Sequence, residues 1–124
     1  MDQVALSNSP DEVVRVFLRS TISSPKVKAA LEEALSLKAK LEETRNLIRR
    51  EEEALKVIEQ DQARMRANMA QVPQTSEAYK RYLKKFDDQE TEIEKRREKI
   101  AKLQDTAEKL RKEFDDFLLK LDVE

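Results

Sequence analysis

Apolar side chains recur three and four residues apart along most of the chain, from about residue 25 to residue 121. This alternation is the seven-residue spacing of the seam between helices in a left-handed coiled coil. In the first half the seam positions are Val27, Ala30, Ala34, Leu37, Leu41, Thr44, Ile48, Glu51, Leu55, Ile58, Gln62, Met65 and Met69. In the second half they are Tyr79, Tyr82, Phe86, Gln89, Ile93, Arg96, Ile100, Leu103, Ala107, Leu110, Phe114, Phe117 and Leu121. The pattern predicts two long helices that pack through these positions.

A proline separates the two halves of the pattern. Pro73 has no backbone donor and disfavours helical backbone at Val72, so the first helix should end near Gln71. Ser76 supplies a capping hydroxyl and Glu77 suits the positive first turn of a second helix. A turn this short makes two long helices run back along each other. We therefore predict an all-α fold, a long antiparallel two-helix coiled-coil hairpin over residues 23–124, with arms at about 25–71 and 76–121.

The residues before the hairpin predict a smaller element. Residues 1–8 read as an extended lead-in, and Ser9 followed by Pro10 is a strong helix start, a capping serine with proline at the first helical position. A short helix over residues 9–22 would carry Val13, Val14, Phe17 and Leu18 on one face. Apolar residues outside the seam also gather near the open end of the hairpin, at Leu31, Leu35, Leu118 and Leu119. We expect the short N-terminal helix to pack there.

Four polar residues interrupt the apolar seam, and they are candidates for setting its register. Folding the chain about the turn places Met65 opposite Phe86 and Gln62 opposite Gln89, with Glu51 one layer from Arg96. Polar residues at seam positions commonly select one register at some cost in stability. The predicted register-setting residues are Glu51, Gln62, Gln89 and Arg96.

The amino-acid composition excludes several kinds of chemical site. Charged residues make up 41% of the 124 residues, glycine is absent, and 26 acids against 25 bases leave a net charge of −1. Cysteine and histidine are also absent, which excludes disulfides, thiolate metal sites and cysteine nucleophiles, and removes the usual general base. No signal peptide pattern and no apolar run of membrane-spanning length is present. We expect a soluble chain, and its compartment stays undetermined.

Clustered carboxylates are the remaining candidates for catalysis or metal binding. Asp87 and Asp88, Asp115 and Asp116, and the run from Glu51 to Glu53 are neighbours in sequence. Neighbours on a helix point about 100° apart, so we read these groups as solvated helix faces. No catalytic residue, metal ligand or cofactor is predicted, and the chain is not expected to be an enzyme.

A basic cluster lies close to the predicted turn. Lys80, Arg81, Lys84 and Lys85 stand beside Tyr79 and Tyr82, a combination that could contact phosphate or an acidic partner. These six residues are the candidate interaction surface at the turn. Asp87 and Asp88 follow immediately and dilute the positive field, which makes nucleic-acid binding the weaker alternative. Leu47, Ala54 and Val57 lie off the seam, either as a second stripe for another copy or as single exposed residues.

Several segments resemble a known bacterial family. They are Ser23 to Leu31, Glu59 to Asn68, Ala78 to Leu83, Lys85 to Asp87 and Gln89 to Glu94. Together they resemble the C-terminal helical region of the family called domain of unknown function 4139. The resemblance implies that a β-rich domain precedes the hairpin, with Val4-Ala5-Leu6 as the end of its last strand. It lends no catalytic residue and no established activity.

These observations predict a non-catalytic structural or protein–protein interaction coiled-coil module, a segment of a larger bacterial protein. A protein partner or self-association is expected, and no membrane contact. The alternative is a nucleic-acid or phosphate-contacting helical arm that uses the basic cluster near the turn.

Overall fold

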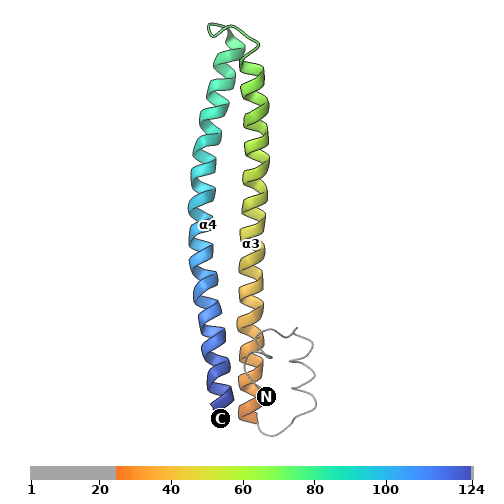
Figure 1. Ribbon diagram of the computed structural model, residues 1–124, viewed down its shortest axis with the longest axis vertical. Coiled ribbons are helices and arrows are strands. Elements are labelled where there is room, and N and C mark those ends of the chain that lie inside the picture. Colours follow the sequence, from red (N-terminus) through yellow and green to blue (C-terminus); the bar gives the residue numbers. More distant parts are fainter. Residues whose placement is uncertain (1–24, 124) are drawn as a thin grey trace. The chain divides into compact units, whose positions relative to one another are not determined.

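The structure is an all-α helical hairpin. The computed structural model describes residues 25–123, and the side chains of residues 25–120. Two helices, α3 (Pro25–Met69) and α4 (Glu77–Val123), account for nearly all of these residues and pack against each other (Figure 1). No strand occurs between residues 25 and 123. The predicted lead-in over residues 1–8 and the predicted short helix over residues 9–22 lie outside the described part of the chain.

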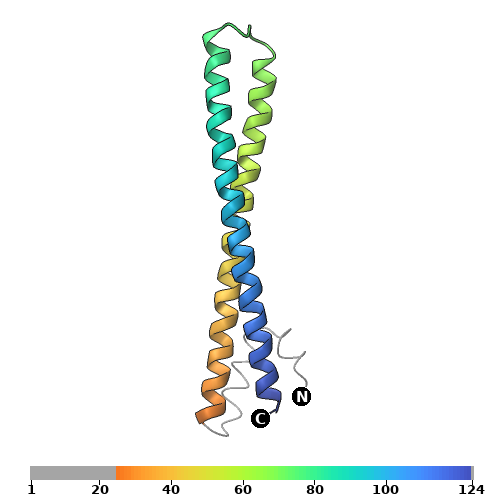
Figure 2. The ribbon, with the colours of Figure 1, turned by 90° about the vertical axis from the view of Figure 1, so that its left-hand side faces the viewer.

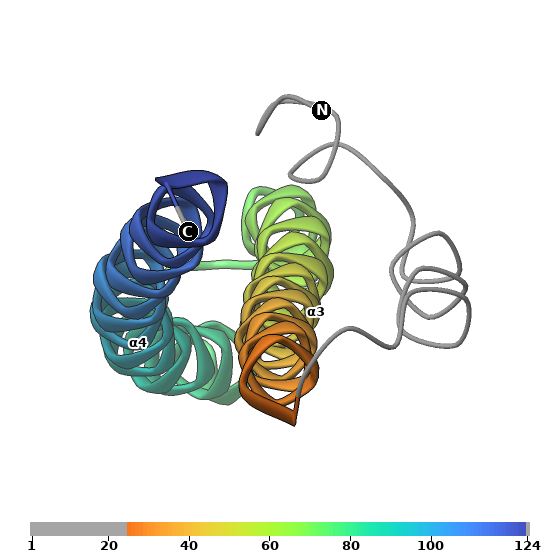
Figure 3. The ribbon, with the colours of Figure 1, turned by 90° about the horizontal axis from the view of Figure 1, so that it is seen from below.

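The described residues form two units. The turn unit, Asn46–Gln104, contains the chain reversal between α3 and α4 (Figure 2). The terminal unit contains residues 25–45 and 105–123. Each helix contributes a segment to both units, and in the end-on view α3 and α4 lie side by side (Figure 3).

The predicted capping of the second helix is confirmed. The Ser76 hydroxyl oxygen accepts a hydrogen bond from the backbone N–H of Tyr79 at 3.1 Å, three residues into α4. This bond satisfies one of the N–H groups that a helix start leaves without a partner. The helix α3 ends at Met69, two residues before the expected position, because the N–H groups of Gln71 and Val72 bond to carbonyls three residues back, at 3.0 and 3.4 Å.

The predicted seam coincides with the buried face of both helices. None of its positions with a described side chain, from Val27 to Phe117, is exposed. In the turn unit the fully buried members are Ile58, Gln62, Met65, Ile93 and Ile100. Thr44, a polar seam residue of the terminal unit, donates its hydroxyl proton to the carbonyl of Lys40 at 2.8 Å, so its burial leaves no unmet donor. The spacing of apolar residues therefore identified the packed face of the hairpin.

The core of the terminal unit is broader than the seam. Ala34, Leu37, Phe114 and Leu118 form one buried cluster, with Leu110 and Phe117 only partly buried beside it. Leu31 and Leu118 flank the seam and are nonetheless buried, whereas Phe117 lies on the seam and remains half-buried. The seven-residue pattern predicts the opposite order of burial for these positions. It assigns burial from spacing and takes no account of side chains beside the seam.

Candidate interaction surface and polar layers

Glu51 and Arg96, two of the predicted register-setting residues, form a direct ion pair in the turn unit. Nη1 of Arg96 donates to Oε1 of Glu51 at 2.9 Å, and the Lys99 ammonium lies 3.3 Å from Oε2 of the same carboxylate. Nε of Arg96 donates to Glu92 at 2.9 Å. The Glu51 side chain is only 13% exposed, so one carboxylate of α3 is held by two cations of α4 with little access to water.

This arrangement changes the acidity of the carboxylate. Burial alone would raise the pKa of Glu51, but hydrogen bonds and charge from Lys99 and Arg96 outweigh burial and lower it. The pKa of Arg96 is raised, first by its hydrogen bond to Glu92 and then by the one to Glu51. Both shifts favour the charged forms that make the pair.

The lowered pKa of Glu51 predicts acid sensitivity. Its contribution to stability is complete above the ordinary pKa of 4.5 and is lost as the pH falls through the lower pKa of the folded chain. At neutral pH we expect Glu51→Gln to unfold at a lower urea concentration than the native chain. That difference should shrink as the pH falls below 4.5 and through the lowered pKa of the folded chain, where the native carboxyl protonates.

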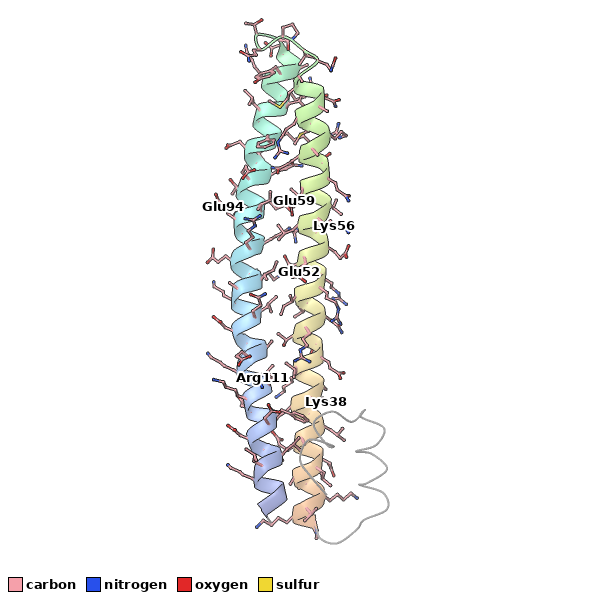
Figure 4. All side chains as sticks on the ribbon, in the orientation of Figure 1. Lys38, Glu52, Lys56, Glu59, Glu94 and Arg111 are labelled. Carbon is pink, nitrogen blue, oxygen red and sulfur yellow. The ribbon has the colours of Figure 1, made fainter. Side chains whose placement is uncertain are left out.

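The matched control for this prediction is Glu59→Gln, which changes an exposed carboxylate on the same helix (Figure 4). It should leave the pH dependence of the urea midpoint as it is in the native chain. A difference between Glu51→Gln and the native chain that stays constant from neutral to acid pH would contradict the prediction.

Gln62 and Gln89 occupy one layer of the seam and bond across it in a crossed arrangement. Nε2 of Gln62 donates to Oε1 of Glu90 at 3.0 Å, and Nε2 of Gln89 donates to Oδ2 of Asp61 at 2.7 Å. Each glutamine amide thus donates to the carboxylate that is next in sequence to the other glutamine, because a charged acceptor makes the stronger hydrogen bond. Oε1 of Gln89 is buried with no hydrogen-bond partner among the described residues.

The carboxylate that receives the Gln89 amide has a lowered pKa. Hydrogen bonds from Gln89 and then from Arg64 lower the pKa of Asp61, and the charges of Arg64 and Lys85 act in the same direction. Arg64 lies 2.9 Å from Asp61 on α3, and Lys85 belongs to α4. Basic side chains of both helices therefore stand near this carboxylate.

The candidate interaction residues at the turn divide into two groups. Lys80, Arg81, Lys84 and Lys85 are exposed, whereas Tyr79 and Tyr82 are half-buried at seam positions. The hydroxyl of Tyr82 accepts a hydrogen bond from Nδ2 of Asn68 at 3.3 Å. Lys80 lies 3.5 Å from Glu77 with both side chains largely exposed, a pair of the kind that contributes little to stability.

Sequence reasoning missed the contribution of the first helix to this surface. The guanidinium of Arg66 lies 5.3 Å from the centroid of the Phe86 ring, within the range of a cation–π contact. Between Asp61 and Asp87 the chain carries six basic side chains and one carboxylate, a net charge of +5, in a protein whose total is −1. The basic residues are Arg64, Arg66, Lys80, Arg81, Lys84 and Lys85. Applying the predicted register to charged as well as apolar positions would have revealed this grouping.

A hollow of about 370 Å³ opens beside the turn. Its lining combines apolar and polar groups from the end of α3, the turn and the start of α4. The lining residues are Arg66, Met69, Ala70, Val72, Gln74 and Tyr79.

Most of the clustered carboxylates are exposed, but Asp115 is half-buried and Glu51 is 13% exposed in its ion pair, so the expectation of a solvated face is wrong for Glu51. Asp87 and Asp88 are both exposed. In the terminal unit Arg111, labelled in Figure 4, bonds Asp115 at 2.9 Å and Glu108 at 2.8 Å along one helix. Within the described residues no group of three or more carboxylates is placed to hold a metal ion.

The off-seam apolar residues of α3 keep part of their surface accessible. Leu47 and Val57 are exposed, and Ala54 between them is half-buried. Leu83 near the turn is also exposed. Neither α3 nor α4, over residues 25–123, contains a stretch apolar enough and long enough to cross a membrane.

The fold defines an all-α helical hairpin. Comparison of the chain with models of protein families, with curated proteins and with solved structures found no match. The resemblance to the helical region of the family called domain of unknown function 4139 stays a prediction from the sequence.

Proposed function

We propose that the chain is a non-catalytic protein–protein interaction module, a coiled-coil segment of a larger bacterial protein whose turn unit contacts a protein partner. The observation that carries the proposal is the surface around the turn. The turn unit carries an exposed group of basic side chains from both helices and a hollow whose lining combines Arg66 with apolar and polar groups. Arginine, tyrosine and methionine, which all line this hollow, are residue types enriched in protein interfaces.

The seam beneath this surface supports the same function. The Glu51–Arg96 pair and the crossed bonds of Gln62 and Gln89 each join α3 to α4 within the turn unit. Contacts of this kind oppose sliding of one helix along the other, since a shifted register would bury these groups without partners. The residues at the turn are therefore held in one arrangement, and a partner meets a preformed surface.

The net charge of +5 near the turn also favours the alternative function, contact with nucleic acid or phosphate. Proteins that hold single strands stack bases on free aromatic faces. Here the aromatic side chains are half-buried in the seam, with Arg66 over the Phe86 ring and the Tyr82 hydroxyl bonded to Asn68. A protein partner uses the hollow and the charges together, and we favour it for that reason.

Site-specific photo-crosslinking in the source cells tests the proposed function. A benzoylphenylalanine at Leu83, which is 47% exposed in the turn unit, should give a covalent adduct of defined mass with one protein. The same label at Lys56, an exposed position of the same unit, should give little or none (Figure 4). Equal adducts at both positions, or none at Leu83, would argue against a partner at the turn.

A further inference from the structure

The hollow beside the turn is an open surface depression that a side chain of a partner can enter. Its volume of about 370 Å³ is at the small end of ligand sites in proteins, so it suits an inserted side chain better than a cofactor. Met69 and Val72 provide half-buried apolar surface in it, and methionine adapts to the shape of what it contacts. An apolar side chain can contact this part of the lining, with the polar groups of Arg66, Gln74 and Tyr79 beside it.

The basic residues near the turn indicate the charge of the rest of the partner. Among the described residues, Arg81, Lys84 and Lys85 form no ion pair. With Asp61, Glu77, Asp87 and Asp88 counted against the six basic residues, residues 61–88 keep a net charge of +2. A positive field of this kind attracts negatively charged partners and opposes basic ones.

Two groups of the lining can bind a carboxylate directly. Arg66 is held over the Phe86 ring, which orders the guanidinium and leaves its N–H groups available for a bidentate bond. The Tyr79 hydroxyl has no hydrogen-bond partner among the described residues. Both side chains border the same hollow, so an apolar anchor and a carboxylate of one peptide could bind side by side.

We infer that the turn unit binds a short acidic segment of a partner protein, with one apolar side chain of that segment in the hollow and its carboxylates on Arg66 and the surrounding basic residues. This inference rests on the proposed function and specifies the chemistry of the partner. It differs from nucleic-acid binding because it requires the apolar lining as well as the positive charge.

Fluorescence anisotropy with defined peptides tests the inference on the full chain. The probes are a labelled peptide of aspartate and glutamate with one central leucine, the same peptide with serine for leucine, a lysine peptide with the leucine, and a single-stranded oligonucleotide. The acidic peptide with leucine should bind most tightly. Its affinity should fall by about tenfold when leucine is replaced by serine, because the apolar contact in the hollow is lost.

Substitutions in the chain test where the acidic peptide binds. Lys84→Glu with Lys85→Glu should weaken binding of the acidic peptide by about tenfold or more, and raised salt should weaken it in the native chain. The matched control, Arg49→Glu with Arg50→Glu, reverses two exposed neighbours elsewhere in the turn unit and should leave the affinity unchanged. Val72→Glu, in the turn rather than a helix, should abolish the advantage of the leucine. Circular dichroism of each variant checks that the helices are retained.

Several results would overturn the inference. They are equal binding of the acidic peptides with and without leucine, equal binding of the lysine peptide, tighter binding of the oligonucleotide, and an adduct at Leu83 whose mass is that of two copies of this chain. If the acidic peptide fails while Leu83 still crosslinks to one partner protein, the inference falls and the proposed function stands. If both fail, the proposed function falls as well.

Discussion

Replacing Leu118 by alanine is expected to lower the free energy of unfolding by about 2–5 kcal/mol, one of the two largest effects that the structure predicts for a single substitution. Leu118 is 2% exposed and packs in the buried cluster of Ala34, Leu37 and Phe114. Truncation removes apolar contacts and leaves a cavity that the neighbouring side chains fill only in part. Urea unfolding followed by circular dichroism measures the loss.

The adjacent residue provides a matched control for Leu118. Leu119 is 50% exposed, so Leu119→Ala makes the same chemical change about 100° around the helix, where water already reaches the side chain. Its effect should stay within about 0.5 kcal/mol. Similar losses at Leu118 and Leu119 would contradict the burial described for the terminal unit. So would a larger loss for Phe117→Ala than for Leu118→Ala.

The second large effect is expected at Met65 in the turn unit. Met65 is 0% exposed, and Met65→Ala should cost about 2–5 kcal/mol of unfolding free energy for the same reason of lost contacts and an unfilled cavity. The same urea experiment measures it.

Met69 is the matched control for Met65, because the seam pattern treats the two methionines as equivalent. Met69 is half-buried and borders the hollow beside the turn, so Met69→Ala leaves a surface that water already reaches. We expect a distinctly smaller loss there. Equal losses at the two positions would show that the seam spacing, rather than the burial in this structure, determines how much each methionine contributes to the free energy of unfolding.

The contacts of the candidate residues could be predicted from the sequence to different extents. Glu51 and Arg96 stand out as charged interruptions of the seam, and the structure places them in contact at 2.9 Å. Gln62 and Gln89 stand out in the same way, but their acceptors are Glu90 and Asp61, which the seam pattern does not single out. A spacing argument finds residues that face the partner helix. It does not rank the acceptors within reach of a flexible side chain.

The interaction surface at the turn could also be predicted only in part from the sequence. Lys80, Arg81, Lys84 and Lys85 are adjacent in sequence and are recognisable as a cluster. Arg66 is fourteen residues before Lys80 in the chain, and its position over Phe86 follows only from the reversal at the turn. The hollow beside it likewise combines residues from both helices and the turn.

The sequence by itself determined the two helices, the turn between them and the face on which they pack. These features depend on local properties: the periodic placement of apolar residues, the backbone restriction at Pro73 and the capping hydroxyl of Ser76. Only the tertiary structure decided that Leu118 is more deeply buried than Phe117, that the glutamines bond in a crossed arrangement, and that Arg66 of α3 and Tyr79 of α4 line one hollow. Each of these depends on side chains from segments distant in sequence, whose shapes and charges meet only after the chain has folded.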